Sequence, residues 1–483
     1  MKNNKSPGDD GISKEFYVTF KDNLTEELTI LLNNILWTGL PTSQKNAIVT
    51  LIYKKGDHRN LANWRPISLL NTDYKILSKI LTNRLRKVIS KIIPDNQKCG
   101  VIGRNIEDIL IAIDSIIEFY EDRNIGAAII TLDQEKAFDR VNHVYLEKTL
   151  REMGLKGNII TWIKAMYTNI TSQIMVNGTL TDKINIERSV RQGCPLSMLL
   201  FTITSVPLIN MILNEKEIKG INTLNNNEIK LLAYADDTTL FIRDTKGIDK
   251  IYKIFDKHGK ASESKLNVAK TEILKIGTWD KKMPDEEKYK DVIKEEVKIL
   301  GAIFTSKKEV TSKINWEKKV RKIQNIIESF AKRNLSLNGK VLLANSVLLS
   351  QIWHIGTVLK IDKKYIGQIN RMLNKWFNGD NGENIINLLN KSKLNGGFGL
   401  LNRAQRLMAI KVKSLGFIMK GITRVELDFI TYWAGTKFLT LSDKHLKGPK
   451  CENCTNDFGK TINVMCKNKA KLKKNRKVKD KRN

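Results

Sequence analysis

The chain of 483 residues carries 83 Lys and Arg against 51 Asp and Glu, a formal net charge of +32, and 41% of its residues are hydrophobic. That length has room for about three domains, each with a sizeable core. Five cysteines in so long a chain exclude a disulfide framework and indicate a reducing compartment, so we expect an intracellular protein of the nucleus or cytoplasm. The positive surplus favours a polyanionic partner, of which nucleic acid is the usual one.

The apolar stretch 192–214 carries no charged residue and imitates a membrane span. Pro195 and Pro207 interrupt it, as do several hydroxyl and amide side chains. We therefore expect a buried helix, a turn and a second short helix, and no membrane partner. The polar N-terminal sequence MKNNKSPGDDG predicts no signal peptide.

The first 123 residues alternate between helical periodicity and short strand-like runs. A 3.6-residue apolar period indicates an early helix with the apolar positions Phe16, Phe20, Leu24, Leu28 and Leu31. The pattern then predicts a strand at 47–52, a basic turn at 53–57, helices at 72–93 and 106–120, and a loop at 97–104 that is rich in glycine and basic residues.

The middle of the chain mixes strands with helices. A partly β-branched run at 127–132 predicts a buried strand that ends in Asp133. The pattern further predicts helices at 143–153, 157–168 and 248–264, a hairpin around Asn177-Gly178, and a strand at 297–304.

Two acidic residues interrupt the apolar segment LLAYADDTTLFIR at 231–243. The runs 231–234 and 238–242 are typical of strands, so we expect Asp236 and Asp237 at the tip of a hairpin. A solvated Asp-Asp turn is the plain alternative, because acidic pairs are common in turns. In an apolar setting the carboxylates repel each other, and a divalent cation that prefers oxygen ligands removes the repulsion.

Asp133 adds a third carboxylate if the strand end meets the hairpin tip. Such a cluster suits two Mg²⁺ ions about 4 Å apart, the arrangement of phosphoryl-transfer polymerases and nucleases. Mn²⁺ is an alternative to Mg²⁺. Spacing along the chain does not by itself bring Asp133 beside Asp236.

The C-terminal part is mainly helical in pattern from 314 to about 422. The last segment, 467–483, holds ten Lys and Arg against one Asp. We expect it to be disordered and to attract polyanions, as a nuclear address or as an ordinary lysine-rich tail. Cys451, Cys454 and Cys466 have only His445 as a nearby fourth ligand, so a structural zinc site is not expected.

Motifs in a fixed order along the chain resemble the reverse transcriptase of LINE-type (non-LTR) retrotransposons. In chain order they are SPGDDGI, KKGD, NWRPISLLNTDYKILSKILTNRL, LDQEKAFDRVNH, RQGCPLSMLLF, YADD, SKLNVAKTEIL, KILGAIF, KWF and LNGGFGLLN. YADD alone is a weak signal, whereas this many ordered motifs are specific. They cover residues from about 6 to 430.

The resemblance implies an α+β right-hand polymerase with an antiparallel palm sheet. It places an N-terminal segment and fingers in 1–123, a palm in 124–306 with an inserted fingers part at about 142–194, a helical thumb and connection in 307–445, and a basic tail in 446–483. The implied activity is RNA-directed DNA polymerisation, with an RNA template, a DNA primer or target and dNTPs as partners. The sequence carries no signal of oligomeric state.

The resemblance also assigns catalytic roles to single residues. Asp133, Asp236 and Asp237 would be the metal ligands of the palm. Lys270 matches the lysine of the block after YADD and would protonate the leaving pyrophosphate. A solvated lysine is the alternative for Lys270.

Some matched positions would bind the incoming nucleotide. Phe138 would lie under its sugar and exclude ribonucleotides, or else be a core aromatic. Arg65, with Lys54 or Lys55, would hold the triphosphate. Arg65 is favoured because a guanidinium binds phosphate at two points.

The remaining matches line the nucleotide pocket or contact nucleic acid. Gln192 and Gly193 match the pocket block, in which a glycine lets the backbone approach a ligand closely. Arg104, Tyr234 and Gly301 would contact the template and primer.

Other functions stay open at this point. An endonuclease usually accompanies such a polymerase, and neither the five residues before SPGDDGI nor the roughly fifty after the matched region have room for one, so we expect a partial copy or a truncated reading frame. A catalytically inactive nucleic-acid-binding remnant fits the charge equally well, although the intact acids argue against it. A maturase-like protein would share the fold, but the NWRPISLLNTDYKIL and LNGGFGLLN blocks favour the LINE-type interpretation.

Overall fold

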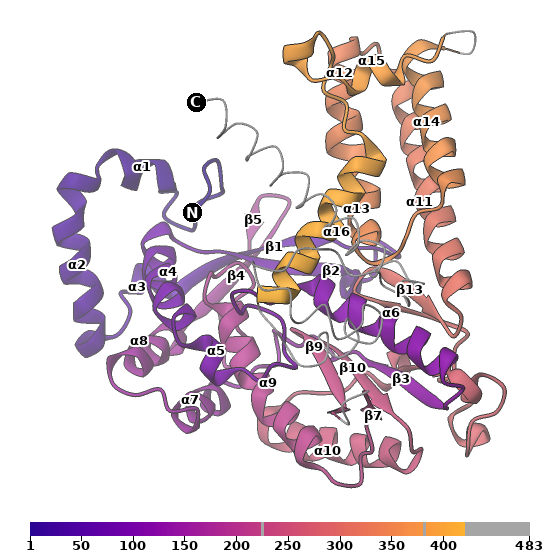
Figure 1. Cartoon of the computed structure of the whole chain (residues 1–483). Coiled ribbons are helices and arrows are strands. Elements are labelled where there is room, and N and C mark those ends of the chain that lie inside the picture. The colour runs from indigo at the N-terminus through magenta and orange to yellow at the C-terminus, as the bar shows by residue number, and fades with distance from the viewer. Residues whose placement is uncertain (224–226, 380–382, 421–483) are drawn as a thin grey trace, which may run out of the picture.

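A computed structural model describes residues 1–223, 227–379 and 383–420 of the chain. The cysteine-containing segment and the basic tail discussed above therefore lie outside the described residues, as does the end of the expected thumb. Figure 1 shows N-terminal helices beside a central region of sheets, with a tall helical bundle formed by the later part of the chain. This α+β architecture, with an antiparallel sheet and a helical C-terminal region, confirms the predicted class.

The N-terminal part surrounds a five-stranded sheet with helices. Its elements are α1 (Lys14–Thr19), α2 (Lys21–Thr38), α3 (Thr42–Lys45), β1 (Asn46–Tyr53), η1 (Leu61–Asn63), β2 (Trp64–Leu69), α4 (Thr72–Arg86), α5 (Ile89–Ile92) and α6 (Ile106–Asp122). The predicted early apolar face is wrong in part, because Phe16 and Phe20 are 42% and 46% exposed while α2 buries Leu32 and Ile35. The prediction of a single helix at 72–93 is also wrong in part, because the structure has two helices there, α4 and α5.

Two segments far apart in the sequence build this sheet. The later segment contributes α7 (His143–Glu152), α8 (Asn158–Tyr167), β4 (Thr171–Val176), β5 (Thr179–Leu180) and β6 (Ile184–Asn185). The strand order is β2-β1-β4-β5, with β6 also on β4, and β1 pairs antiparallel with β2 but parallel with β4. The segment 142–194 therefore joins its strands to those of the N-terminal region.

A second sheet of four antiparallel strands carries the acidic residues. Its strands are β3 (Ala127–Leu132), β9 (Leu231–Tyr234), β10 (Asp237–Ile242) and β11 (Glu272–Ile276), in the order β11-β3-β10-β9. Alternate residues face different cores. Ile129 packs in the hydrophobic core that also contains α6. Ile130 packs in a second core with α9 (Ser197–Asn214) and α10 (Lys246–Ser262). Because both faces are buried, a register slip would exchange the two sets of side chains, so the register is strongly specified.

One continuous helix, α9, occupies most of the uncharged stretch. The predicted turn at Pro207 is wrong, since the helix runs through it. The hydroxyls of Thr202, Thr204 and Ser205 donate to carbonyls three residues earlier, which pairs these polar groups inside the core. In the described residues, α9 and the stretch Leu337–Val358 are long and apolar enough to cross a membrane, and 67% and 50% of the apolar 18-residue window in each is buried in the fold.

A short hairpin leads into the helical bundle. Its strands are β12 (Glu296–Ile299) and β13 (Ala302–Thr305), which replace the single strand predicted at 297–304 because Leu300 and Gly301 take positive φ and reverse the chain. The following elements are α11 (Lys308–Ala331), α12 (Leu337–Leu343), η5 (Ala344–Leu348), α13 (Ser350–Val358), α14 (Lys363–Asn378), α15 (Ile386–Asn390), η6 (Lys393–Asn395) and α16 (Arg403–Lys420). The minor elements of the middle region are β7 (Ile221–Asn222), β8 (Glu228–Ile229), η2 (Val268–Lys270), η3 (Gly277–Asp280) and η4 (Glu286–Tyr289).

Candidate active site

The predicted acidic hairpin is present as β9 and β10. Asp237 pairs with Tyr234, so Ala235 and Asp236 form a two-residue turn. On the other side of β10, the β3 register ends with Leu132 opposite Thr238. Asp133, the residue that follows β3, therefore emerges beside the start of β10. The sheet thus brings the strand end and the hairpin tip together, which spacing along the chain did not establish.

The three carboxylates influence one another. Burial, together with the negative charges of Asp236 and Asp133, raises the pKa of Asp237 to about 6. Burial also raises the pKa of Asp236, with a smaller contribution from Asp133. Oxygen ligands that repel each other in a partly buried place suit a hard divalent cation by their chemistry.

Lys270 holds one of these carboxylates. Its Nζ lies 3.0 Å from Oδ2 of Asp133, and the N–H of Asn267 donates to the Asp133 carbonyl at 2.8 Å. With the side chains in these positions, no three His, Cys, Asp or Glu side chains in the described ranges converge closely enough to share a metal ion. A metal ion at Asp133 would compete with Lys270 for the carboxylate.

Two basic residues of the first sheet act on the acidic turn. The positive charge of Lys54 partly offsets the rise in the pKa of both Asp236 and Asp237. The positive charge of Arg65 does the same for Asp236. Both basic side chains are exposed, at the end of β1 and in β2. Of the two lysines left open by the sequence, this interaction favours Lys54 as the partner of Arg65.

The aromatic residue proposed to select the sugar is partly a core residue. Phe138 is half-buried and stacks on Phe201 of α9, with ring centroids 4.6 Å apart and an interplanar angle of 12°. One ring face is thus used in packing. The role of sugar selection stays a prediction.

The pocket block contacts the first sheet. Gln192 Nε2 donates to Asp139 Oδ1 at 3.2 Å, and both residues line a cavity of about 410 Å³. At Gly193 φ is 121°, and an added Cβ would lie 2.5 Å from the carbonyl oxygen of Ser68. Close approach of β2 therefore requires glycine at this position, and the approach of a ligand to Gly193 stays a prediction.

Arg104 makes several contacts inside the protein, and its contact with template and primer stays a prediction. Its guanidinium donates to the carbonyls of Ile93, Pro94 and Gln97 at 2.7–3.1 Å and pairs with Asp95 at 2.8 Å. The side chain is only 10% exposed. These contacts fold the segment 93–97 around the guanidinium.

The other two proposed nucleic-acid contacts lie on different hairpins. Tyr234 ends β9, directly before the acidic turn, and is half-buried. Gly301 is exposed in the β12–β13 turn, where the nearest side chain beyond its chain neighbours is His354 of α13. Their contacts with template and primer stay predictions.

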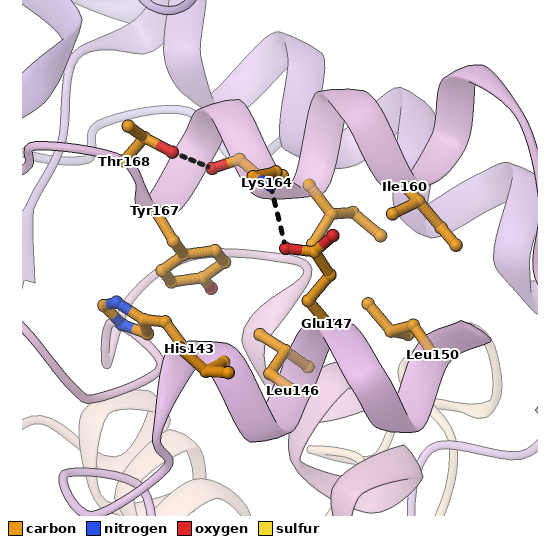
Figure 2. A pocket seen from close by; sticks show the side chains of 10 residues that line it. His143, Leu146, Glu147, Leu150, Ile160, Lys164, Tyr167 and Thr168 are labelled. Atoms are coloured by element: carbon orange, nitrogen blue, oxygen red, sulfur yellow. Dashed lines mark hydrogen bonds and ion pairs between the residues drawn. The ribbon is translucent and has the colours of Figure 1, made fainter. Parts of the chain in front are cut away.

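A well-formed pocket elsewhere is separate from these residues. Figure 2 shows it between α7 and α8, with the ion pair of Glu147 and Lys164 across it. Its volume is about 180 Å³ and its walls are mainly apolar. None of the residues that line it is a predicted site residue, so we do not include it in the site.

Sequence reasoning missed a segment that contacts the hairpin. Residues 96–98, expected within or beside a loop, run parallel to β9. Ala233 exchanges hydrogen bonds with this segment, since its N–H donates to the Asn96 carbonyl and its carbonyl accepts from Lys98, at 2.8 and 2.9 Å. Strand patterns cannot reveal a pairing this short.

Comparison with known proteins identifies the family. Residues 52–304 match the family described as reverse transcriptase (RNA-dependent DNA polymerase). The "Transposon TX1 uncharacterized 149 kDa protein" of Xenopus laevis is 33% identical over 381 residues, which cover 77% of this chain and 29% of that protein. A "Retrovirus-related Pol polyprotein from type-1 retrotransposable element R2" of Popillia japonica is 29% identical over 236 residues, which cover 49% of this chain and 32% of that protein.

The chain therefore spans less than a third of the length of either relative. A solved structure of apo telomerase from Candida tropicalis aligns with 86% of this chain and 72% of that chain at 11% identity, with a TM-score of 0.39 that is too low to support an argument. The retrotransposon relatives confirm the resemblance found in the sequence. Because the family match takes in more than half of its residues, the chain belongs to the reverse transcriptase (RNA-dependent DNA polymerase) family.

Proposed function

We propose that the chain is an RNA-directed DNA polymerase that extends a primer 3′-hydroxyl with dNTPs on an RNA template. The observation that carries this proposal is the juxtaposition of Asp133 with the Asp236-Asp237 turn in a chain of the reverse transcriptase family. The retrotransposon relatives support a non-LTR element as its origin.

The three carboxylates would hold two Mg²⁺ ions, or Mn²⁺ in their place. When bound, such ions lower the pKa of the primer hydroxyl and neutralise charge on the leaving pyrophosphate. Lys270 would release Asp133 when the site is loaded. Its ammonium group would then be available to protonate the pyrophosphate.

The residues around the acids would bind and select the nucleotide. The charges of Lys54 and Arg65 already affect the pKa values of the acidic turn. A triphosphate bound between these two side chains and the acids would therefore contact Lys54 and Arg65 on the side away from the carboxylates. Phe138 would contact the sugar with the ring face that Phe201 does not cover. Gln192 would line the pocket with its amide.

The template and primer would follow the basic surface that a net charge of +32 implies. We place the activity inside the cell, in the nucleus or cytoplasm. The free thiols of Cys99 and Cys194 among the described residues support a reducing compartment.

Primer extension on poly(rA)/oligo(dT) with Mg²⁺ tests the proposal. The purified chain should extend the primer with dTTP, and an Asp236→Ala, Asp237→Ala double variant should not. Absence of extension by the unmodified chain, with RNA binding intact, would instead support a nucleic-acid-binding remnant.

A further inference from the structure

The turn that carries the acids is held by one buried side chain. Gln97 is fully buried, at 0% exposure. Its Oε1 accepts hydrogen bonds from the N–H of Ala235 at 3.0 Å and of Cys99 at 3.1 Å, and its Nε2 donates to the Ala235 carbonyl at 3.1 Å. We call this pair of contacts to Ala235 the Gln97 clamp. Both peptide groups of a single turn residue are thus fixed by one amide.

The segment that carries Gln97 is itself held in place by hydrogen bonds. The backbone of residues 96–98 pairs with Ala233 in β9, and Asn96 Nδ2 donates to the Leu231 carbonyl at 2.9 Å. The Arg104 guanidinium also donates to the Gln97 carbonyl at 2.8 Å. Gln97 therefore cannot move without breaking several buried hydrogen bonds.

The turn needs such support for two reasons. Ala235 has φ of 56°, in the left-handed region that is unfavourable for an L-residue with a Cβ. Asp236 and Asp237 repel each other and Asp133. Backbone strain and charge repulsion both favour a relaxed turn that would carry the carboxylates away from the end of β3.

We propose that Gln97 is a positioning residue, which keeps Ala235 left-handed and so keeps Asp236 and Asp237 in register with Asp133 for divalent metal ions. This inference rests on the proposed function of the acids. It goes beyond that function because Gln97 contacts neither the carboxylates nor a substrate site, and acts through the backbone of Ala235.

Replacement of Gln97 by an apolar side chain of similar length tests the clamp. In Gln97→Met both contacts to Ala235 are lost. We expect the rate of single-dTTP incorporation to fall about 100-fold, the effect of a misplacement near 1 Å, with the KM for dTTP changed less than threefold. The Kd for Mn²⁺ alone, without nucleic acid or dTTP, should rise about tenfold, because the carboxylates are no longer prearranged.

A second-site change separates positioning from general stability. Glycine takes positive φ without strain, so Ala235→Gly removes one cause of relaxation. We expect Gln97→Met with Ala235→Gly to recover about fivefold of the lost Mn²⁺ affinity, since glycine removes the left-handed strain at position 235. Gln97→Glu keeps the acceptor for the Ala235 N–H and loses the donor to its carbonyl, so it gives an intermediate Kd and serves as the test variant if Gln97→Met does not fold.

A buried amide elsewhere in the chain provides a matched control. Asn315 in α11 accepts from the Ile303 N–H at 3.0 Å and donates to the Ile303 carbonyl, which reproduces the Gln97 clamp in the β13 strand. Asn315→Leu should lower the temperature of unfolding as Gln97→Met does. Its Kd for Mn²⁺ should stay within twofold of that of the unmodified chain.

The Mn²⁺ measurement is independent of polymerisation. If the unmodified chain binds Mn²⁺ but extends no primer, the proposed function fails and the Gln97 variants still decide the inference. A Kd within twofold of the unmodified value for Gln97→Met, or for Gln97→Glu if that is the folded variant, would overturn it. So would equal weakening of Mn²⁺ binding by Asn315→Leu, or no recovery by Ala235→Gly.

Discussion

The β9–β10 and β12–β13 hairpins both reverse the chain through a residue with left-handed backbone, but with different side chains in and around the turn. Both use a two-residue turn whose first residue is not glycine yet has positive φ, 56° at Ala235 and 47° at Leu300. Each turn is held by a polar side chain from another element: the Gln97 amide contacts Ala235, and Nε2 of His354 donates to the Leu300 carbonyl at 2.9 Å.

The two turns differ at the second position. Gly301 has φ of 89° and suits a tight reversal. The first hairpin has Asp236 there, followed by Asp237, so it carries two charges where the other carries none. A turn that is both strained and repulsive is expected where function, rather than folding, selects the residues.

The largest expected contrast is at the charged turn itself. Asp237→Asn should lower dTTP incorporation at least about 100-fold, the loss typical for one preorganised charged or polar group in a catalytic site. It should also raise the unfolding free energy of the metal-free chain at pH 7 by about 1 kcal/mol, a figure reduced for the exposure of this side chain. Urea denaturation in EDTA measures the stability.

The gain in stability should depend on pH in a defined direction. The folded pKa of Asp237 is about 6, above its ordinary 3.8. The ionised carboxylate therefore destabilises the fold fully above pH 6, and the penalty fades as the pH falls toward 3.8. A stability difference between Asp237→Asn and the unmodified chain that stays constant from pH 7 to pH 4 would contradict the assignment.

Substitution of the glycine in the other hairpin should destabilise without affecting metal binding. Gly301→Ala has room for its Cβ, with His354 Nε2 at 3.4 Å, so its cost is backbone strain of about 1–2 kcal/mol. The Kd for Mn²⁺ should not change. Gly367→Ala is the control, since this glycine in α14 has open space and no positive φ, and alanine there should stabilise by about 0.5–1 kcal/mol.

The reverse substitution at the charged turn should stabilise slightly. Ala235→Gly relieves left-handed strain but adds backbone freedom to the unfolded chain, for a net gain of about 0.5 kcal/mol. Opposite signs for Ala235→Gly and Gly301→Ala in urea denaturation would support left-handed backbone at both positions. A loss of stability in both would contradict it.

The smallest effect on stability is expected at Lys270. Its side chain is 65% exposed, so Lys270→Gln should change the unfolding free energy by less than about 0.5 kcal/mol. Mn²⁺ should bind about threefold more tightly, because Asp133 loses its competing partner. Lys265→Gln is the control: this lysine is equally exposed but pairs with Glu135 at 3.8 Å, and its loss should leave the Kd for Mn²⁺ unchanged.

Much of the fold and of the acidic site could be predicted from local pattern. The strand at 127–132 and the YADD hairpin follow from apolar runs bounded by acids, and both are present. The turn at Leu300 and Gly301 was not predicted, because leucine at the first turn position gives no turn signal. The hydrogen bond that holds it comes from His354, which lies 54 residues away.

Hydrogen bonds formed only in the folded chain account for what the local pattern did not show. Arg104 is basic and lies in a glycine-rich loop, which suggested a nucleic-acid contact but gave no sign of its hydrogen bonds to carbonyls seven to eleven residues earlier. The buried Gln97 gave no signal, because its partner Ala235 lies 138 residues away. Such contacts depend on the assembled fold and have no periodicity that a sequence shows.

In the function proposed above, the strained and repulsive β9–β10 turn binds divalent metal ions together with Asp133. Titration of Mn²⁺ by electron paramagnetic resonance, with and without Asp236→Asn and Asp237→Asn together, tests it most directly. We predict that the unmodified chain removes the signal of free Mn²⁺ in a saturable way and that the double variant does not. Equal uptake by both proteins would contradict the claim.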